Sequence, residues 1–119
     1  MKNEKDLKTR TKRFALDVIS MYSALPKTTV AQVIGKQVLR SGTSVGANYR
    51  EAYRGRSTAE FMAKMGDCLK ELDESVFWFE LLVEGGVVPG EKLTDLMREA
   101  DELIAIFVII IKKTKKNNS

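Results

Sequence analysis

Basic side chains recur on one face of residues 36–54 and are the clearest chemical signal in the chain. Spaced three or four residues apart, they share one side of a helix with two small residues between them. The members of this basic stripe are Lys36, Arg40, Thr43, Ala47, Arg50 and Arg54. A row of cations can follow the phosphates of a nucleic acid. It can equally form a solvated or intersubunit face that meets acidic helices, and periodicity alone leaves both interpretations open.

Other cations lie outside this stripe in the sequence, and together with it they make up a candidate nucleic-acid site. Its members are Lys12, Arg13, Lys36, Arg40, Arg50, Arg54, Arg56, Lys112 and Lys113. Only two aromatic residues, Tyr49 and Tyr53, lie close to the stripe, whereas proteins that hold single strands stack bases on aromatic rings. The composition of the site therefore favours contacts to phosphates and does not indicate base-specific recognition.

A second set of polar residues shares one side of the same helix within about 80°. The members of this polar seam are Arg40, Ser44, Asn48 and Glu51. They could form a ligand-binding pocket. The simpler interpretation is a buried hydrogen-bond network that fixes the helix register, with Arg40 and Glu51 available as an ion pair. We expect the network.

The chain lacks the residue patterns of most enzymes. It contains no histidine, which removes the commonest general base and the commonest zinc ligand. Its one cysteine, Cys68, falls on the apolar side of a helix, where a buried and inert thiol is expected. No glycine-rich phosphate loop occurs, and the Glu-x-x-His pairs of bundle metal sites are absent. We therefore expect a non-enzymatic protein with no catalytic residue, no metal and no cofactor.

Four helices must position these residues, and apolar periodicity predicts them at 6–25, 30–54, 58–84 and 91–113. The third helix has the strongest pattern, a heptad seam of Phe61, Met65, Cys68, Leu72, Ser75, Phe79 and Leu82. Because the links are short, neighbouring helices should pack antiparallel, which gives an all-α, up-down-up-down four-helix bundle. Residues 1–5 are expected to fray. The basic tail at 112–119 is expected to be disordered.

Local signals mark the ends of the second and third helices. Thr29 with Gln32, and Ser57 with Glu60, have the spacing of a capping box, so each threonine or serine is expected to cap a helix. Gly55 is expected to end the second helix in the left-handed conformation.

Small residues dominate the middle of the second helix: Ser41, Gly42, Thr43, Ser44, Gly46 and Ala47. Each interior glycine costs roughly 1 kcal/mol relative to alanine in a helix. A helix that accepts this cost is expected to approach another backbone closely at these positions.

Two places carry more apolar surface than one bundle needs. They form a candidate oligomer interface, whose members are Phe77, Trp78, Leu81, Ile106, Ile109 and Ile110. Scattered apolar residues are normal on protein surfaces, but large exposed patches are rare on monomers. The pattern therefore favours association of the chain with further copies of itself.

Length and charge set the class of the protein. At 119 residues the chain is long enough for one domain, spanning 1–119, with a core of its own. Residues 1–59 carry twelve basic and four acidic side chains, residues 60–102 carry four and twelve, and residues 103–119 carry four basic ones. No signal-peptide pattern is visible, and the longest apolar run, 104–111, is far shorter than the roughly 20 residues of a membrane span. With its single cysteine, this predicts a cytoplasmic protein that does not enter the membrane.

The stretch LRSGTSVGANYREAYRGRSTAEF resembles a bacterial family of four-helix bundles, encoded in intervening sequences of large-subunit (23S) ribosomal RNA genes. The accessory variability protein of diversity-generating retroelements shares this fold. The matching positions are Leu39, Arg40, Ser41, Thr43, Ser44, Val45, Ala47, Asn48, Glu51, Ser57, Glu60 and Phe61. Gly46 departs from the pattern, because proline often precedes the Ala-Asn pair, and Gly42 adds a second glycine. Both keep the helix slim.

The resemblance implies a four-helix bundle that forms a ring of five subunits with a basic surface. The retroelement member binds a reverse transcriptase and nucleic acid. We therefore expect a homo-oligomer that binds RNA or a ribonucleoprotein through its basic surface. The alternative is a protein–protein adaptor, for example an accessory protein of a reverse transcriptase, that has no direct contact with nucleic acid.

Overall fold

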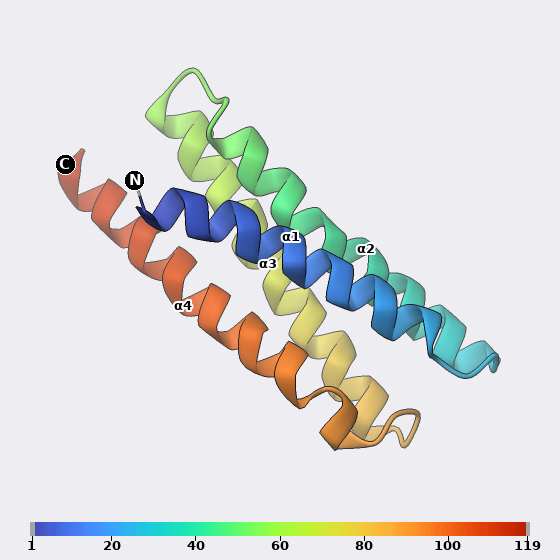
Figure 1. Ribbon diagram of the computed structural model, residues 1–119. Helices are drawn as coiled ribbons and strands as arrows, with labels where there is room; N and C mark the ends of the chain where they lie inside the picture. The colour runs from blue at the N-terminus through green and yellow to red at the C-terminus, as the bar shows by residue number, and fades with distance from the viewer. Residues whose placement is uncertain (1, 119) are drawn as a thin grey trace.

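Four α-helices and one short 3-10 helix make up the part of the chain that the computed structural model describes, residues 2–118, with side chains described from residue 7 onward (Figure 1). The elements are α1 (Lys2–Ser23), α2 (Thr29–Ala52), α3 (Thr58–Glu84), η1 (Gly90–Lys92) and α4 (Thr94–Asn117). No strand occurs between residues 2 and 118. The predicted all-α class is therefore confirmed.

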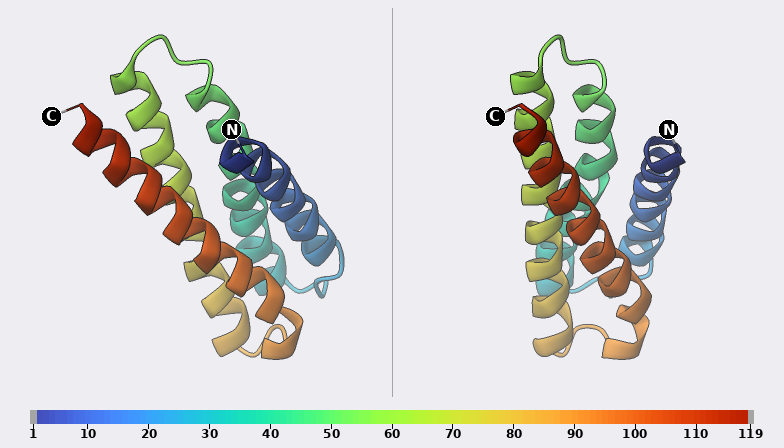
Figure 2. Two further views of the ribbon diagram at one scale, coloured as in Figure 1. Left: turned by 60° about the vertical axis from the view of Figure 1, so that its left-hand side comes forward. Right: turned by 90° about the vertical axis from the view of Figure 1, so that its left-hand side faces the viewer.

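The helices lie along an elongated body of 48 × 22 × 21 Å. Figure 2 shows the α2–α3 link at one end of this body, together with the C-terminal end of α4, and the other two links at the opposite end. The most extensive helix contact is between α2 and α3, whereas α1 and α4 have the smallest contact of the four neighbouring helix pairs. Contacts from Ser41 to Ser75 and from Glu51 to Lys64 show that α2 and α3 run antiparallel.

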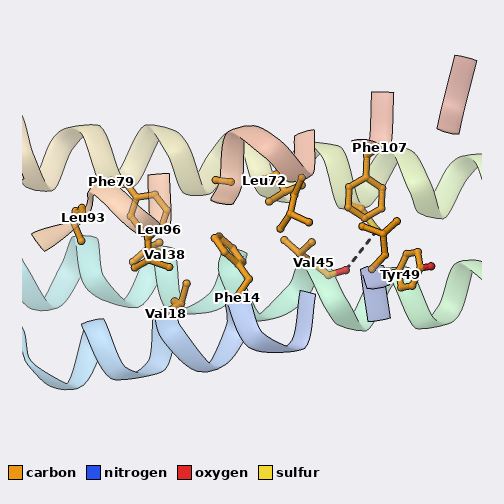
Figure 3. Close-up of a cluster of buried hydrophobic side chains, with 14 of the residues drawn as sticks. Phe14, Val18, Val38, Val45, Tyr49, Leu72, Phe79, Leu93, Leu96 and Phe107 are labelled. Atoms are coloured by element: carbon orange, nitrogen blue, oxygen red, sulfur yellow. Dashed lines mark hydrogen bonds between the residues drawn. The ribbon is translucent and has the colours of Figure 1, made fainter. Parts of the chain in front are cut away.

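Apolar side chains from all four helices meet along the axis of this body (Figure 3). Phe14 of α1 packs edge-on against Phe79 of α3, with ring centroids 6.4 Å apart, and Tyr49 of α2 packs the same way against Phe107 of α4 at 5.9 Å. The heptad seam predicted for the third helix is buried from Met65 onward: Met65, Cys68, Leu72, Ser75, Phe79 and Leu82. Periodicity alone therefore identified the core side of α3.

Glycines on α2 allow α1 to approach closely. A Cβ atom added at Gly42 would lie 2.8 Å from Val18 Cγ2, and one added at Gly46 would lie 3.2 Å from Thr11 Oγ1. Both partner side chains belong to α1, and both are buried. The close backbone approach expected from the small residues is confirmed, and α1 is the helix that makes it.

One of the two predicted capping boxes is confirmed in its first half: Ser57 is the N-cap of α3, but the Glu60 side chain bonds the N–H of Arg56 and not that of Ser57. Ser57 Oγ accepts a hydrogen bond from the Glu60 backbone N–H at 3.1 Å, and the Glu60 carboxylate accepts one from the Arg56 N–H at 2.6 Å. The two side chains thus satisfy backbone donors at the start of α3.

The other capping box is wrong by one residue. Thr28, in extended conformation, is the N-cap of α2, and its hydroxyl accepts from the Ala31 N–H at 3.2 Å. Gln32 does not reach back to a cap, because its amide accepts from the Tyr22 hydroxyl at 3.0 Å and donates to the Pro26 carbonyl at 3.0 Å. Gln32 therefore fastens α2 to the end of α1 instead.

The prediction for Gly55 is also wrong, because Gly86, with a φ of 74°, is the only residue with positive φ in the described chain. Gly55 instead fits a crowded link, where an added Cβ would lie 3.2 Å from the Ala52 carbonyl oxygen. A side chain at this position would push against the end of α2.

Both chain ends are more helical than expected. The helix α1 begins at Lys2, although residues 1–5 were expected to fray, and α4 continues to Asn117 through the tail expected to be disordered. Thr114 Oγ1 donates to the Ile110 carbonyl at 2.8 Å, and lysines suit the negative end of a helix dipole. Met1 and Ser119 lie outside the described residues.

Candidate nucleic-acid interface

The basic stripe of α2 does not act as one unit. Lys36, Arg50 and Arg54 are exposed, but Arg40 turns toward α3 and pairs with Glu71 at 3.2 Å and with Glu74 at 2.5 Å. The hydrogen bond that Arg40 donates to Glu74 raises the pKa of Arg40 and lowers the pKa of Glu74. Arg40 therefore joins α2 to α3 and contributes less to the outer surface than the other cations do.

The predicted ion pair between Arg40 and Glu51 is wrong. Eleven residues of helix separate the two Cα atoms by about 16 Å, which is too far for a direct contact. Glu51 pairs instead with Lys64 of α3 at 3.0 Å, while Ser44 donates to the Arg40 carbonyl within its own helix at 2.6 Å. The polar seam is therefore a row of contacts at the half-exposed edge of α2.

The buried polar link between α2 and α3 lies elsewhere. Ser41 Oγ and Ser75 Oγ are 2.7 Å apart, both residues are fully buried, and Ser75 also donates to the Glu71 carbonyl at 2.9 Å. Periodicity places Ser75 in the heptad seam and Ser41 among the small residues of the second helix, but it does not pair them. Pairing them requires the register between the two helices.

A groove of about 460 Å³ between α1 and α2 collects four cations. Lys8 and Lys12 stand on α1, and Arg50 and Arg54 stand on α2, all with exposed side chains. Small residues line the space between them: Thr11, Ala15, Thr43, Gly46 and Ala47. Among residues 7–118, Glu51 is the one acidic residue that lines it, and Lys64 pairs with it. We call this feature the basic groove.

Sequence reasoning identified three cations of the basic groove and missed Lys8. The signal was available, because Lys8 and Lys12 are one helical turn apart on α1. Arg13 is exposed beside Asp17 at 3.6 Å, and Arg56 is exposed in the α2–α3 link. Neither lines the groove. Lys112 and Lys113 are exposed near the end of α4.

The two tyrosines near the basic groove differ in accessibility. Tyr49 is 2% exposed and packs against Phe107, so its ring belongs to the core. Tyr53 is 44% exposed and lies edge-on against Tyr49 and Phe61, at 5.1 and 5.3 Å. Only the ring of Tyr53 therefore has a surface to offer a nucleotide.

Cys68 has the buried environment that the sequence predicts. Its side chain is inaccessible, and its thiol donates to the Val45 carbonyl at 3.5 Å. Burial, with a smaller contribution from Asp67, raises the pKa of the thiol to about 12. A thiolate is the reactive form, so the native thiol is unreactive.

We expect native Cys68 to resist alkylation by iodoacetamide at pH 9, whereas the unfolded chain reacts within minutes. A thiol whose pKa is raised by folding stabilises the fold below its unfolded pKa, near 9, and loses that contribution as the pH rises toward 12. Mass spectrometry with and without denaturant measures the difference. Equal labelling rates in the two states would contradict the buried assignment.

The candidate oligomer interface divides into exposed and partly buried residues. Phe77 is 50%, Leu81 36% and Ile109 52% exposed. Trp78, Ile106 and Ile110 are half-buried against the core, and the indole N–H of Trp78 has no hydrogen-bond acceptor among the described residues. The prediction missed four other exposed apolar residues: Leu16, Ile19, Val30 and Val33.

The described residues contain neither a metal-binding cluster nor a membrane-spanning helix. No group of three or more Cys, Asp or Glu side chains within residues 7–118 has an arrangement that could hold a metal ion. None of the helices in the described part of the chain is long and apolar enough to cross a membrane.

Comparison with known proteins places this geometry in a family. The chain is similar to a protein of unknown function from the S23 ribosomal protein family of Bacteroides thetaiotaomicron, known from a crystal structure, with 34% sequence identity and a TM-score of 0.86. The alignment covers 92% of this chain and 97% of that one. No curated protein matches the sequence. A profile of the family described as 23S rRNA-intervening sequence protein matches residues 4–108. The chain therefore belongs to the 23S rRNA-intervening sequence protein family.

Proposed function

We propose that this protein is a non-enzymatic RNA-binding bundle of the bacterial cytoplasm, and that the basic groove is its contact surface for the phosphate backbone. The observation that supports this is the convergence of Lys8 and Lys12 with Arg50 and Arg54 across one groove. Two helices that face each other with cations on both sides can hold a strand between them. The small residues that line the basic groove let an RNA strand approach the backbones of α1 and α2.

The electrostatics of the groove suit an anionic strand. None of its four cations forms an ion pair with an acidic side chain in residues 7–118, so binding a phosphate would break no such contact. Each phosphate that is neutralised releases condensed counterions, and this release drives association at low salt. With Tyr53 as the only exposed aromatic ring beside the groove, recognition is directed at backbone and shape.

Replacing both Arg50 and Arg54 with glutamate should weaken the binding of RNA about tenfold or more at roughly 0.1 M salt. The slope of log affinity against log salt should become shallower by about 0.7 for each lost phosphate contact. Fluorescence anisotropy with a labelled single-stranded RNA and a labelled hairpin measures both quantities. Circular dichroism checks that helicity is retained.

Two cations elsewhere in the molecule, in η1 and α4, provide a matched control. Lys92 and Arg98 are exposed and lie outside the basic groove, so replacing both with glutamate changes the net charge by the same amount. This control should bind RNA within about twofold of the wild-type protein if position matters more than total charge. Unchanged affinity after reversal at Arg50 and Arg54 would overturn the proposal and favour the adaptor function.

We also propose that the protein is a single antiparallel up-down-up-down domain whose copies assemble into a ring of five, as the family resemblance implies. Exposed Phe77 and Ile109 supply apolar surface for such contacts. The mass of the wild-type particle, measured by light scattering after size exclusion, tests this assembly. A mass of one subunit would overturn it.

A further inference from the structure

Exposed apolar residues of α2 and α3 lie side by side near the start of α2. The contact from Arg40 to Glu74 fixes the antiparallel register of the two helices. Val33 precedes Arg40 by seven residues and Leu81 follows Glu74 by seven, so the two residues stand at about the same height along the antiparallel helices. Together with their neighbours on the same side, the exposed residues are Val30 (57%), Val33 (57%), Phe77 (50%) and Leu81 (36%).

Carboxylates surround this apolar surface on α3. Asp73, Glu80 and Glu84 stand at i−4, i+3 and i+7 from Phe77, and all three are exposed. None of them pairs with a cation among the side chains of residues 7–118. Glu71 and Glu74, in contrast, are occupied by Arg40. We call these four apolar residues and three carboxylates the acidic patch.

Near its C-terminal end, α4 carries an exposed apolar residue beside basic side chains, where the acidic patch has apolar residues beside carboxylates. Ile109 is 52% exposed, and Lys112 and Lys113 follow it at i+3 and i+4, both exposed. Ile106 and Ile110 flank it and are partly buried. We call this the basic end of α4.

The two surfaces lie at opposite ends of one molecule. Figure 2 shows the C-terminal end of α4 beside the α2–α3 link, whereas α3 reaches its C-terminal end at the other end of the body. Twenty-two residues of α3 separate Thr58, beside the α2–α3 link, from Glu80, which is about 33 Å at 1.5 Å per residue and far beyond the reach of an ion pair. A single chain therefore cannot bring its basic end onto its own acidic patch, although a second copy can.

We propose that the basic end of α4 of one copy docks on the acidic patch of a second copy. Ile109 covers Phe77 and Leu81, while Lys112 and Lys113 lie within reach of Glu80 and Glu84. The apolar contact supplies most of the binding free energy, and the charges select the partner surface and its orientation. Because each copy uses two different surfaces, the contact is heterologous and propagates unless it closes into a ring. This pairing rests on the self-association in the proposed function.

Charge-swap variants of the full chain test the pairing. One variant carries Lys112→Glu and Lys113→Glu, a second carries Glu80→Lys and Glu84→Lys, and a third carries all four substitutions. Each one-sided variant should weaken association at least tenfold, and the combined variant should recover it to within about threefold. Light scattering over a dilution series at about 0.1 M salt measures the association, and circular dichroism checks folding. The control Lys92→Glu with Arg98→Glu should assemble like the wild type.

Each outcome decides one point. A monomeric wild type would overturn the self-association in the proposed function, and this pairing with it. An assembled wild type that neither one-sided variant disturbs would overturn this pairing alone. One-sided losses without recovery in the combined variant would show that the two surfaces meet other partners, and would also overturn it. RNA affinity of the Arg50→Glu, Arg54→Glu variant, measured by anisotropy, reports on the basic groove separately, because neither residue belongs to the two docking surfaces.

Discussion

Replacing Gly42 with valine is expected to lower the free energy of unfolding by about 3 kcal/mol, near the upper end of the usual cost of overpacking. A Cβ atom at this position would lie 2.8 Å from Val18 Cγ2 and 3.1 Å from Val18 Cγ1. Val18 is fully buried, and a β-branched side chain in a helix has essentially one rotamer. The clash can therefore be relieved only by moving α1 away from α2, which opens the core around Phe14.

The matched control is Gly66 in the middle of α3. Apart from the surrounding backbone of α3, no atom lies within 4 Å of a Cβ added there, and the residue is exposed. Because valine is a slightly better helix former than glycine, Gly66→Val should change stability by no more than about 0.5 kcal/mol. Urea denaturation followed by circular dichroism, at one protein concentration, measures both variants. Equal losses would show that the cost comes from the helix itself and not from the contact with α1.

The small residues of α2 show what sequence reasoning can provide. The helical cost of glycine was enough to predict a close helix contact at Gly42 and Gly46, and the structure confirms it. The partner helix could not be predicted, because α1 and α3 both neighbour α2 along the chain. The prediction did not name Gly35 among the close-contact glycines, although a Cβ added there would lie 2.5 Å from Leu25 Cδ1 at the end of α1.

The presence of the four helices could be predicted from the sequence, whereas the residues at which they begin and end depend on local contacts. The bounds of α3 are those predicted, because Ser57 and Gly85 give unambiguous signals. The start of α2 was misplaced by one residue, since Thr28 and Thr29 are equally good caps as residue types. The choice between them depends on the path of the chain after Pro26, which a single sequence does not contain.

The candidate site was predictable only in part, for a related reason. Helical periodicity groups residues on one helix, so Arg40 and Arg54 seemed equivalent, yet only Arg40 has α3 carboxylates within reach. The basic groove needs the register between α1 and α2, which brings Lys8 opposite residues near the end of α2. Val33 joins the acidic patch in the same way, through the register of α2 and α3. The register between neighbouring helices, which decides which of their residues lie opposite each other, could therefore not be predicted from the sequence.

Tyr49→Ala is expected to lower the free energy of unfolding by about 3–5 kcal/mol, as for other large aromatic side chains in cores. Tyr49 is 2% exposed, and its ring connects α2 to Phe107 of α4. The substitution would leave a cavity where α4, which has few contacts with α1, depends on the core for its position. Thermal and urea unfolding at fixed protein concentration give the loss.

Tyr53→Ala is the matched control for this prediction, because it removes the same side chain one turn further along α2. Tyr53 is 44% exposed and packs edge-on against Tyr49 and Phe61, so the loss should be about 1 kcal/mol. If the ring of Tyr53 also stacks on a nucleotide, this variant should weaken RNA binding severalfold while remaining folded. Similar stability losses for the two variants would contradict the division between a core tyrosine and a surface tyrosine. That division is what leaves Tyr53 as the one aromatic ring beside the basic groove that can meet RNA without unfolding the bundle.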